Sequence, residues 1–254
     1  MSLLWIKWRF LIKTLVLNDV HVPAQSPKWQ RKVGEFLNKE RPPKIVLAGD
    51  ILDIHSLSTH GKAKSRSRNY EWEFHKELEG GTKFFTWLRE LAPRADIQYI
   101  IGNHEERLEK YINTRAPLMS IAEFGRWDRI LGLEDHNIRV PRKDVFVPCG
   151  QGQRCLIRHG HEGRPGLSKF AGGTALKIAE NQGVNTFCGH THKLGVMVSI
   201  AGGKQIYGAE GGYGGKLNHP YMGYVKGKKL PWVLAFTYFD SEQRANPFPN
   251  FVKA

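Results

Sequence analysis

Five groups of aspartate, histidine and asparagine constrain this chain most, because each group follows a short apolar segment. In chain order they are Asp19-x-His21, Gly49-Asp50-x-x-Asp53, Gly102-Asn103-His104-Glu105, His159-Gly160-His161 and Gly189-His190-x-His192. The apolar segments, such as 14–17, 44–48 and 97–101, have the length of buried strands. In an open α/β sheet, ligands bind at the carboxyl ends of strands. The five groups therefore predict one functional site.

The segments between these groups favour an α/β fold. Helices are predicted at 27–40, 71–91 and 174–181 from the spacing of their apolar residues. Strands and helices alternate in the first two thirds of the chain, which is typical of a largely parallel sheet. Further strands are predicted at 144–147, 154–159, 184–188, 196–201, 204–208 and 232–239. We expect these strands to form a second, more antiparallel sheet packed against the first.

We expect residues 1–254 to form a single domain with two long loops. One is a basic insertion at about 54–70, and the other is a glycine-rich segment at about 202–227. Residues 1–13 lack the uninterrupted apolar run and cleavage site of a signal peptide, so an edge strand or a mobile terminus is expected there. No run approaches the 18 or so apolar residues of a membrane span, and no membrane partner is expected.

The net charge indicates which classes of partner to expect, and the cysteine content indicates the redox compartment. The formal net charge is +14, which favours polyanions such as nucleic acid, nucleotides, anionic lipid or phosphoprotein. The three cysteines, Cys149, Cys155 and Cys188, match no zinc pattern. Free, mostly buried thiols in a reducing cytoplasm are expected. The aromatic cluster of Trp5, Trp8 and Phe10 would permit a homo-oligomer contact, although core packing is the preferred interpretation.

The residue types in the five groups indicate metal binding. Carboxylate, imidazole and amide ligands suit divalent first-row metals, and residues i and i+2 of a strand share a face. Each group alone is weak evidence: Asp19-x-His21 or Gly49-Asp50 is more often a turn, and a lone His159 is more often a core or surface histidine. Their succession at predicted strand ends is what indicates a metal site.

As a set, the groups closely resemble the motifs of the calcineurin-like metallophosphoesterase superfamily, over about residues 14–192. The resemblance implies a four-layer α/β/β/α sandwich of two mixed sheets. It also implies two divalent ions bridged by Asp50, with manganese preferred over iron, zinc, nickel or magnesium. The other implied ligands are Asp19, His21 and His192 for the first ion, and Asn103, His159 and His190 for the second.

The resemblance implies further roles beside the ligands. His104 would contact the phosphate and protonate or steady the leaving oxygen, so that Asp50 and His104 are the implied catalytic residues. Asp53 would orient the ligands by hydrogen bonding. His161 would contact a ligand or the substrate, or have a structural role, because the histidine before the glycine is the usual ligand in this superfamily.

The substrate is less constrained. Phosphoprotein phosphatases of this superfamily carry Asp-Arg-Gly after the second motif, whereas this chain reads Asp53-Ile54-His55. The arrangement of the motifs in this chain more closely resembles that of phosphodiesterases and of nuclease subunits of DNA repair complexes. It also resembles phage-encoded members of the superfamily that share the stretch at 102–108. We therefore predict hydrolysis of phosphodiesters in nucleic acid or nucleotides. The alternatives are a phosphomonoesterase (a nucleotidase or a protein phosphatase) and a scaffold without catalysis, although no ligand position is lost.

The basic insertion is the candidate substrate surface. Its residues Lys62, Lys64, Arg66, Arg68 and Tyr70 lie in the insertion that follows the second motif. Such a strip can follow a nucleic acid backbone, with Tyr70 or Trp72 stacking on a base. A solvated loop without a partner is an equally good interpretation.

Overall fold

The structure is a computed structural model that describes residues 13–58, 70–115, 127–163, 165–216, 230–243 and 247–254. Its first sheet has the strand order β11-β10-β1-β2-β3-β4. The strands of this sheet are β1 (Lys13–Leu17), β2 (Lys44–Ala48), β3 (Asp96–Ile100), β4 (Ile138–Arg139), β10 (Ala235–Asp240) and β11 (Asn250–Lys253). β1 to β4 run parallel to one another, β10 pairs antiparallel with β1, and β11 pairs antiparallel with β10.

The central strands are buried on both faces. Leu15 and Leu17 of β1 pack toward the helices, whereas Val16 packs toward the second sheet. Successive side chains of a strand point to opposite faces, so a continuous apolar run marks a strand covered on both sides. This burial fixes the end of β1, and with it the position of the polar residues that follow.

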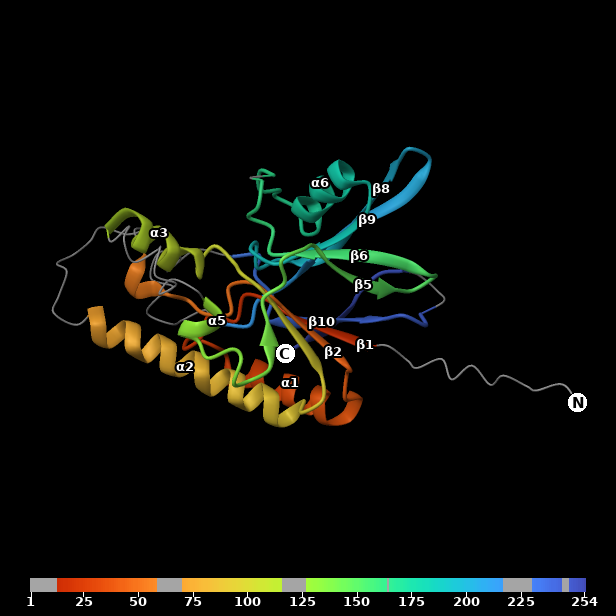
Figure 1. The fold of residues 1–254 in the computed structure, drawn as a ribbon. Coiled ribbons are helices and arrows are strands. Elements are labelled where there is room, and N and C mark those ends of the chain that lie inside the picture. Colours follow the sequence, from red (N-terminus) through yellow and green to blue (C-terminus); the bar gives the residue numbers. More distant parts are fainter. Residues whose placement is uncertain (1–12, 59–69, 116–126, 164, 217–229, 244–246) are drawn as a thin grey trace, which may run out of the picture.

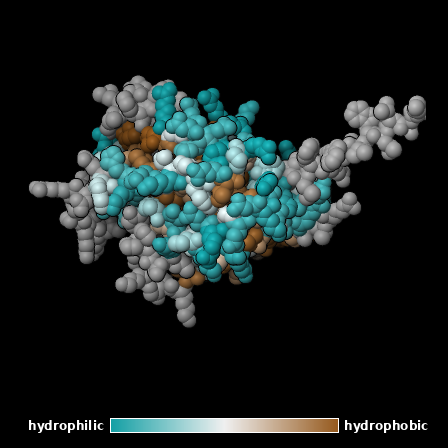
Figure 2. All heavy atoms as spheres, turned by 90° about the horizontal axis from the view of Figure 1, so that it is seen from below, coloured by the Kyte–Doolittle hydropathy of each residue, from teal (hydrophilic) through white to brown (hydrophobic). Residues whose placement is uncertain are grey.

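Helices α1 (Pro27–Glu40) and α2 (Tyr70–Leu91) cover the outer face of the first sheet. Ser26 caps α1 by accepting a hydrogen bond from the Trp29 backbone N–H at 3.4 Å, and Pro27 occupies the first turn. Trp29, Val33 and Leu37 form the buried face of α1 at the four-residue spacing of a helix. Seen from below in Figure 2, the surface is mostly hydrophilic, with smaller apolar areas between the hydrophilic side chains.

The second sheet has the order β5-β6-β7-β9-β8. Its strands are β5 (Val145–Cys149), β6 (Gln153–Arg158), β7 (Asn185–Cys188), β8 (Leu194–Ala201) and β9 (Lys204–Gly211). The sheet is mixed, because β6, β7 and β9 run parallel while β5 and β8 are antiparallel to their neighbours. One apolar core joins the two sheets, and α6 (Gly173–Gln182) packs on the outer face of the second. Figure 1 shows the resulting α/β/β/α layers, which confirm the predicted fold class.

Several elements were not predicted from the sequence. They are η1 (His55–Leu57), α3 (Glu106–Arg115), α5 (Trp127–Ile130), β4 and β11. Within the glycine-rich segment, Lys204–Gly211 is strand β9, and residues 217–229 lie outside the described residues, as do residues 1–12. The three cysteines are free and buried. No helix within the described ranges combines the length and apolar character needed to cross a bilayer.

Candidate metal centre

The predicted ligands meet where five strands end. The segments after β1, β2, β3, β6 and β7 carry Asp19 and His21, Asp50, Asn103, His159, and His190 and His192 respectively. The described residues contain three sets of possible ligands, and within each set the ligand atoms lie within 4.8 Å of one another. The sets are Asp19, His21 and His192; His21, Asp50 and His104; and Asp50, His159 and His190. The first and the last of these sets share no residue, and we call them the first and the second triad; the middle set shares His21 with the first triad and Asp50 with the second.

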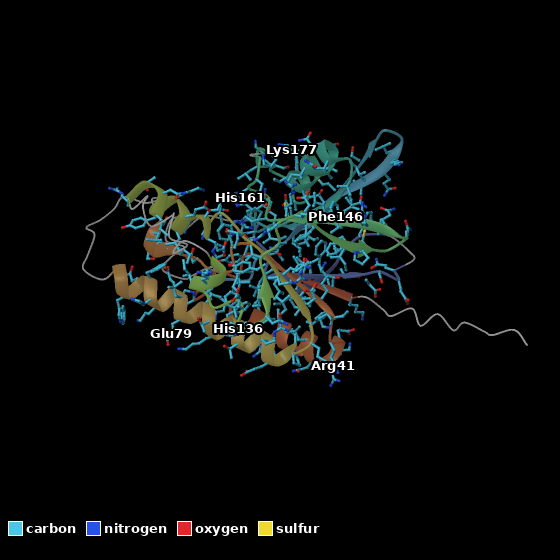
Figure 3. All side chains as sticks on the ribbon, viewed as in Figure 1. Arg41, Glu79, His136, Phe146, His161 and Lys177 are labelled. Carbon is cyan, nitrogen blue, oxygen red and sulfur yellow. The ribbon has the colours of Figure 1, made fainter. Side chains whose placement is uncertain are left out.

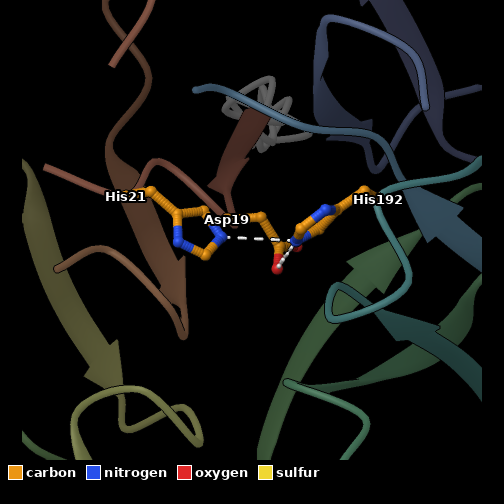
Figure 4. A group of neighbouring side chains, drawn as sticks. All are labelled: Asp19, His21 and His192. Atoms are coloured by element: carbon orange, nitrogen blue, oxygen red, sulfur yellow. Dashed lines mark hydrogen bonds and ion pairs between the residues drawn. The ribbon is translucent and has the colours of Figure 1, made fainter. Parts of the chain in front are cut away.

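The first triad offers three ligand atoms to one point (Figure 4). Nε2 of His21 lies 3.3 Å from Nε2 of His192, which in turn lies 3.2 Å from Oδ1 of Asp19. Ligand atoms bound tetrahedrally to one ion at about 2.1 Å are about 3.4 Å apart, so this spacing fits a single divalent ion. Asp19 and His21 have no solvent exposure, and Nδ1 of His192 is buried without a partner.

The second triad, joined by Asn103, has a similar arrangement. Nε2 of His159 lies 3.2 Å from Oδ2 of Asp50 and 3.0 Å from Oδ1 of Asn103. Nδ1 of His159 is 3.0 Å from the Ala48 carbonyl, to which it donates. This bond orients the ring and leaves Nε2 as the ligand atom. Burial, followed by the nearby His159, lowers the pKa of His190 to about 4, which favours the neutral imidazole that binds metals.

The charges of this cluster fit a cation. Burial would raise the pKa of Asp50, but His104 and His159 outweigh it and hold the pKa well below its usual range. Burial would lower the pKa of His159, but Asp50 raises it to about 10. Protonated imidazole thus supplies the positive charge that these buried carboxylates require. A divalent ion at the same place supplies that charge and displaces the proton, so the residues present fit metal ions.

The backbone at the ligands is strained. Asp19, His21, Asp50, His190 and His192 have φ angles of 49°, 54°, 50°, 66° and 60°. Side-chain-bearing residues rarely adopt this left-handed conformation, and such strain concentrates at functional sites. The strain is consistent with a structure that holds these side chains for a ligand.

Two glycines of the motifs are explained by close approach to ligand side chains. A Cβ at Gly49 would lie 2.4 Å from Nδ1 of His159, and one at Gly189 would lie 2.4 Å from Oδ2 of Asp19. Gly49 also has a φ of 83°. A larger residue at either position would displace a ligand.

His104 lies beside Asp50 and is held by Asp53. Nδ1 of His104 is 2.7 Å from Oδ1 of Asp53, and its backbone N–H donates to Oδ1 of Asp50 at 2.9 Å. Nε2 of His104 lies 3.7 Å from Oδ2 of Asp50. Asp53 also lies 3.4 Å from Nδ1 of His21, and Arg107 donates to the Asp53 carbonyl at 2.7 Å. Although burial would raise the pKa of Asp53, His104 and His21 lower it, so Asp53 is an ionised contact shared by both rings.

Of the remaining predicted site residues, the structure describes the surroundings of His161 but not those of the basic insertion. His161 lies between α3 and the end of β6 (Figure 3), with Nε2 2.8 Å from Oε1 of Glu106 and its ring 5.2 Å from that of His159. Lys62, Lys64, Arg66 and Arg68 lie outside the described residues, as does the side chain of Tyr70, the first residue of α2. The structure therefore does not place the predicted basic strip relative to the site.

Glu105 is a site residue to which sequence reasoning assigned no role. Its fully buried carboxylate accepts hydrogen bonds from the backbone N–H groups of Asp50 (3.0 Å), Leu52 (2.9 Å) and Gly102 (2.9 Å), and from the Tyr99 hydroxyl (2.7 Å). These bonds tie the end of β2 to the end of β3. The sequence contained a clue to this role, because a glutamate directly after two site residues of a motif can accept hydrogen bonds from the backbone that positions them.

Comparison with known proteins agrees with this geometry. The model of the calcineurin-like phosphoesterase family matches residues 12–194. No curated protein sequence matched the chain.

Similar solved structures include vacuolar protein sorting 29 from Cryptosporidium parvum (12% identity, 96% of this chain and 97% of that chain covered, TM-score 0.47). They also include Chaetomium thermophilum Vps29 (12% identity, 96% and 97% covered, TM-score 0.48). A third is the Escherichia coli phosphoesterase YfcE (17% identity, 89% and 87% covered, TM-score 0.38). The family model spans most of the chain and all five motifs. On that match, the chain belongs to the calcineurin-like phosphoesterase family.

Proposed function

We propose that this protein is a phosphodiesterase that depends on two divalent metal ions and acts on nucleic acid or nucleotides. The observation that carries the proposal is the position of Asp50. Its carboxylate lies in one ligand set with His159 and His190 and in another with His21, which itself belongs with Asp19 and His192. A carboxylate within reach of both triads can be shared by two ions.

The ligands then divide between two positions. Asp19, His21 and His192 would hold one ion, Asn103, His159 and His190 would hold the other, and Asp50 lies where it could serve both. When bound, such a pair of ions activates a water molecule and neutralises charge on the phosphate oxygens.

His104 acts on the leaving group. Asp53 anchors Nδ1 of its ring at 2.7 Å, which leaves Nε2 directed toward the Asp50 side of the site. From Nε2, His104 donates a proton to the departing alkoxide, and Asp53 keeps the ring in the orientation and tautomer for this step. General acid catalysis of this kind contributes roughly 10²–10⁴-fold to rate.

Charge favours a diester over a monoester. A phosphodiester carries one negative charge, whereas a monoester approaches two at neutral pH. Glu106 pairs with His161 at 2.8 Å, and Glu162 accepts hydrogen bonds from the His159 and Gly160 backbone. Glu106 is also paired with Lys110 at 2.7 Å, so Glu162 is the carboxylate that disfavours additional negative charge on that side, while the net charge of +14 favours a polyanionic substrate.

The proposal is tested with metal-free protein reloaded with manganese. Bis-p-nitrophenyl phosphate, DNA and RNA are compared with p-nitrophenyl phosphate, mononucleotides and phosphopeptides. For the wild type we expect diester cleavage, and about two ions per chain by elemental analysis. Asp50→Ala should lose the cleavage and the ions. The control Glu109→Gln, on the exposed face of α3, should retain the cleavage and the ions. Cleavage of monoesters alone would show a phosphomonoesterase, and protein without retained ions or activity would show a scaffold.

A further inference from the structure

An aromatic wall borders the site on the side of the first triad. The ring of Trp232 lies 4.2 Å from that of His192 at an interplanar angle of 79°, and the ring of Tyr213 lies 4.5 Å from that of His192. Trp232 and Tyr213 are themselves 5.2 Å apart. Tyr213 is buried, whereas Trp232 and Leu230 are partly buried against it. Trp232 is thus a partly exposed indole in direct contact with a candidate metal ligand.

The backbone holds this wall in place. The Val233 N–H donates to the His192 carbonyl at 3.2 Å, and the Tyr213 N–H donates to the Val233 carbonyl at 2.9 Å. The Ala235 N–H returns a bond to the Tyr213 carbonyl at 3.1 Å. The segment that carries Trp232 is therefore fixed to the same backbone that positions His192.

Polar side chains border the site at two other places. His104 and Asp53 border it on one side and His161 with Glu106 on another. A nucleotide diester has one flat, weakly polar part, which is its base. We propose that Trp232 forms a nucleobase-stacking subsite beside Asp19, His21 and His192; this inference rests on the proposed function, because it takes a nucleotide diester as the substrate.

Stacking on an indole explains what the subsite recognises. Every base has an aromatic face, so the subsite accepts different bases and discriminates against a diester that lacks one. Removal of an aromatic platform weakens binding by roughly 5- to 150-fold per base. The effect is therefore expected only for substrates that carry a base at the stacked position.

The experiment compares dithymidine monophosphate with two counterparts, each lacking the base of one nucleoside. In the manganese-loaded wild type, kcat/KM for one of the two counterparts should be roughly 5- to 150-fold lower than kcat/KM for dithymidine monophosphate. Relative to the counterpart without the stacked base, Trp232→Ala lowers kcat/KM for dithymidine monophosphate by a similar factor, so that the preference of the wild type is lost. Trp232→Phe retains most of the discrimination, and both variants are checked for folding by circular dichroism.

The matched control is Trp87→Ala. Trp87 is also partly buried, but it packs against Phe84 of the helix layer and beside Gly34 of α1. We expect this variant to lose stability without changing the ratio of kcat/KM values between the substrates. An equal fall for all three substrates in Trp232→Ala would show a structural role and overturn the inference, as would no change for any of them.

Binding separates this inference from the proposed function. The methylphosphonate analogue of dithymidine monophosphate is not cleaved, and its affinity is measured by calorimetry. Weaker binding to Trp232→Ala in a protein that cleaves no diester would support the subsite and reject the phosphodiesterase. Cleavage of bis-p-nitrophenyl phosphate together with unchanged binding of the analogue to Trp232→Ala would reject the subsite and leave the phosphodiesterase standing.

Discussion

Replacement of Glu105 by alanine tests whether this buried carboxylate supports the site. Four donors lose their acceptor: the backbone N–H groups of Asp50, Leu52 and Gly102, and the Tyr99 hydroxyl. A buried donor without a partner costs about 1–3 kcal/mol. If water entering the vacated space serves two of the four, the remaining two cost about 4 kcal/mol together.

Glutamine at position 105 should cost less than alanine. Oε2 of Glu105 accepts from Asp50 and Gly102, and Oε1 accepts from Leu52 and the Tyr99 hydroxyl. The amide oxygen can replace Oε2, while the Tyr99 hydroxyl turns to accept from the amide nitrogen. The Leu52 N–H and the hydrogen of the Tyr99 hydroxyl then lack an acceptor, but the neutral amide avoids the burial cost that raises the pKa of Glu105. We expect a net loss of about 2 kcal/mol, smaller than that of alanine.

The assay is urea unfolding in EDTA, followed by manganese titration of the folded variants. The free energy of unfolding should fall in the order wild type, Glu105→Gln, Glu105→Ala, while Glu109→Ala on the exposed face of α3 stays within about 0.5 kcal/mol of wild type. Manganese affinity should fall roughly 10- to 100-fold in Glu105→Ala, because the Asp50 N–H loses its acceptor, and less in Glu105→Gln, whose amide oxygen still accepts from Asp50. A Glu105→Ala variant as stable as Glu109→Ala would refute this reasoning.

Three further predictions concern other residues. His104→Gln should slow hydrolysis of alkyl diesters by roughly 10²–10⁴-fold and aryl diesters much less, because p-nitrophenolate needs no proton to leave; steady-state rates on both substrates check this, and equal losses would contradict it. Gly49→Ala should weaken manganese binding in calorimetry, since its Cβ would lie 2.4 Å from Nδ1 of His159, and unchanged affinity would count against this close approach. Burial raises the pKa of Glu77 to about 7, above its unfolded value, so its folded form keeps a proton that the unfolded chain loses. Between about pH 4.5 and 7, wild type should therefore lose on the order of 3 kcal/mol relative to Glu77→Gln in urea unfolding, whereas parallel pH profiles would show that Glu77 titrates normally.

The sequence predicted well what depends on local pattern. The boundaries of α1 matched its prediction, because Ser26 and Pro27 mark the start and the apolar spacing marks the face. The strand at 44–48 was equally recognisable as a short apolar run, and the strand predicted at 184–188 is found at 185–188. By contrast, α3 has only Leu108 and Ile112 as buried residues, too few to give a clear period. β4 is two residues long, and only its pairing with β3 makes it a strand.

The sequence by itself determined which side chains are available and that they follow strands, because residue type and periodicity are local properties. The tertiary structure alone decided which of them meet. Asp19 and His192 are far apart in the chain, and only the packing of the two sheets brings Nε2 of His192 to 3.2 Å from Oδ1 of Asp19. The same packing placed Trp232 against His192 and gave Glu105 its four donors. Sequence spacing cannot supply such distances, because they depend on strand order and register between segments that are remote in the chain.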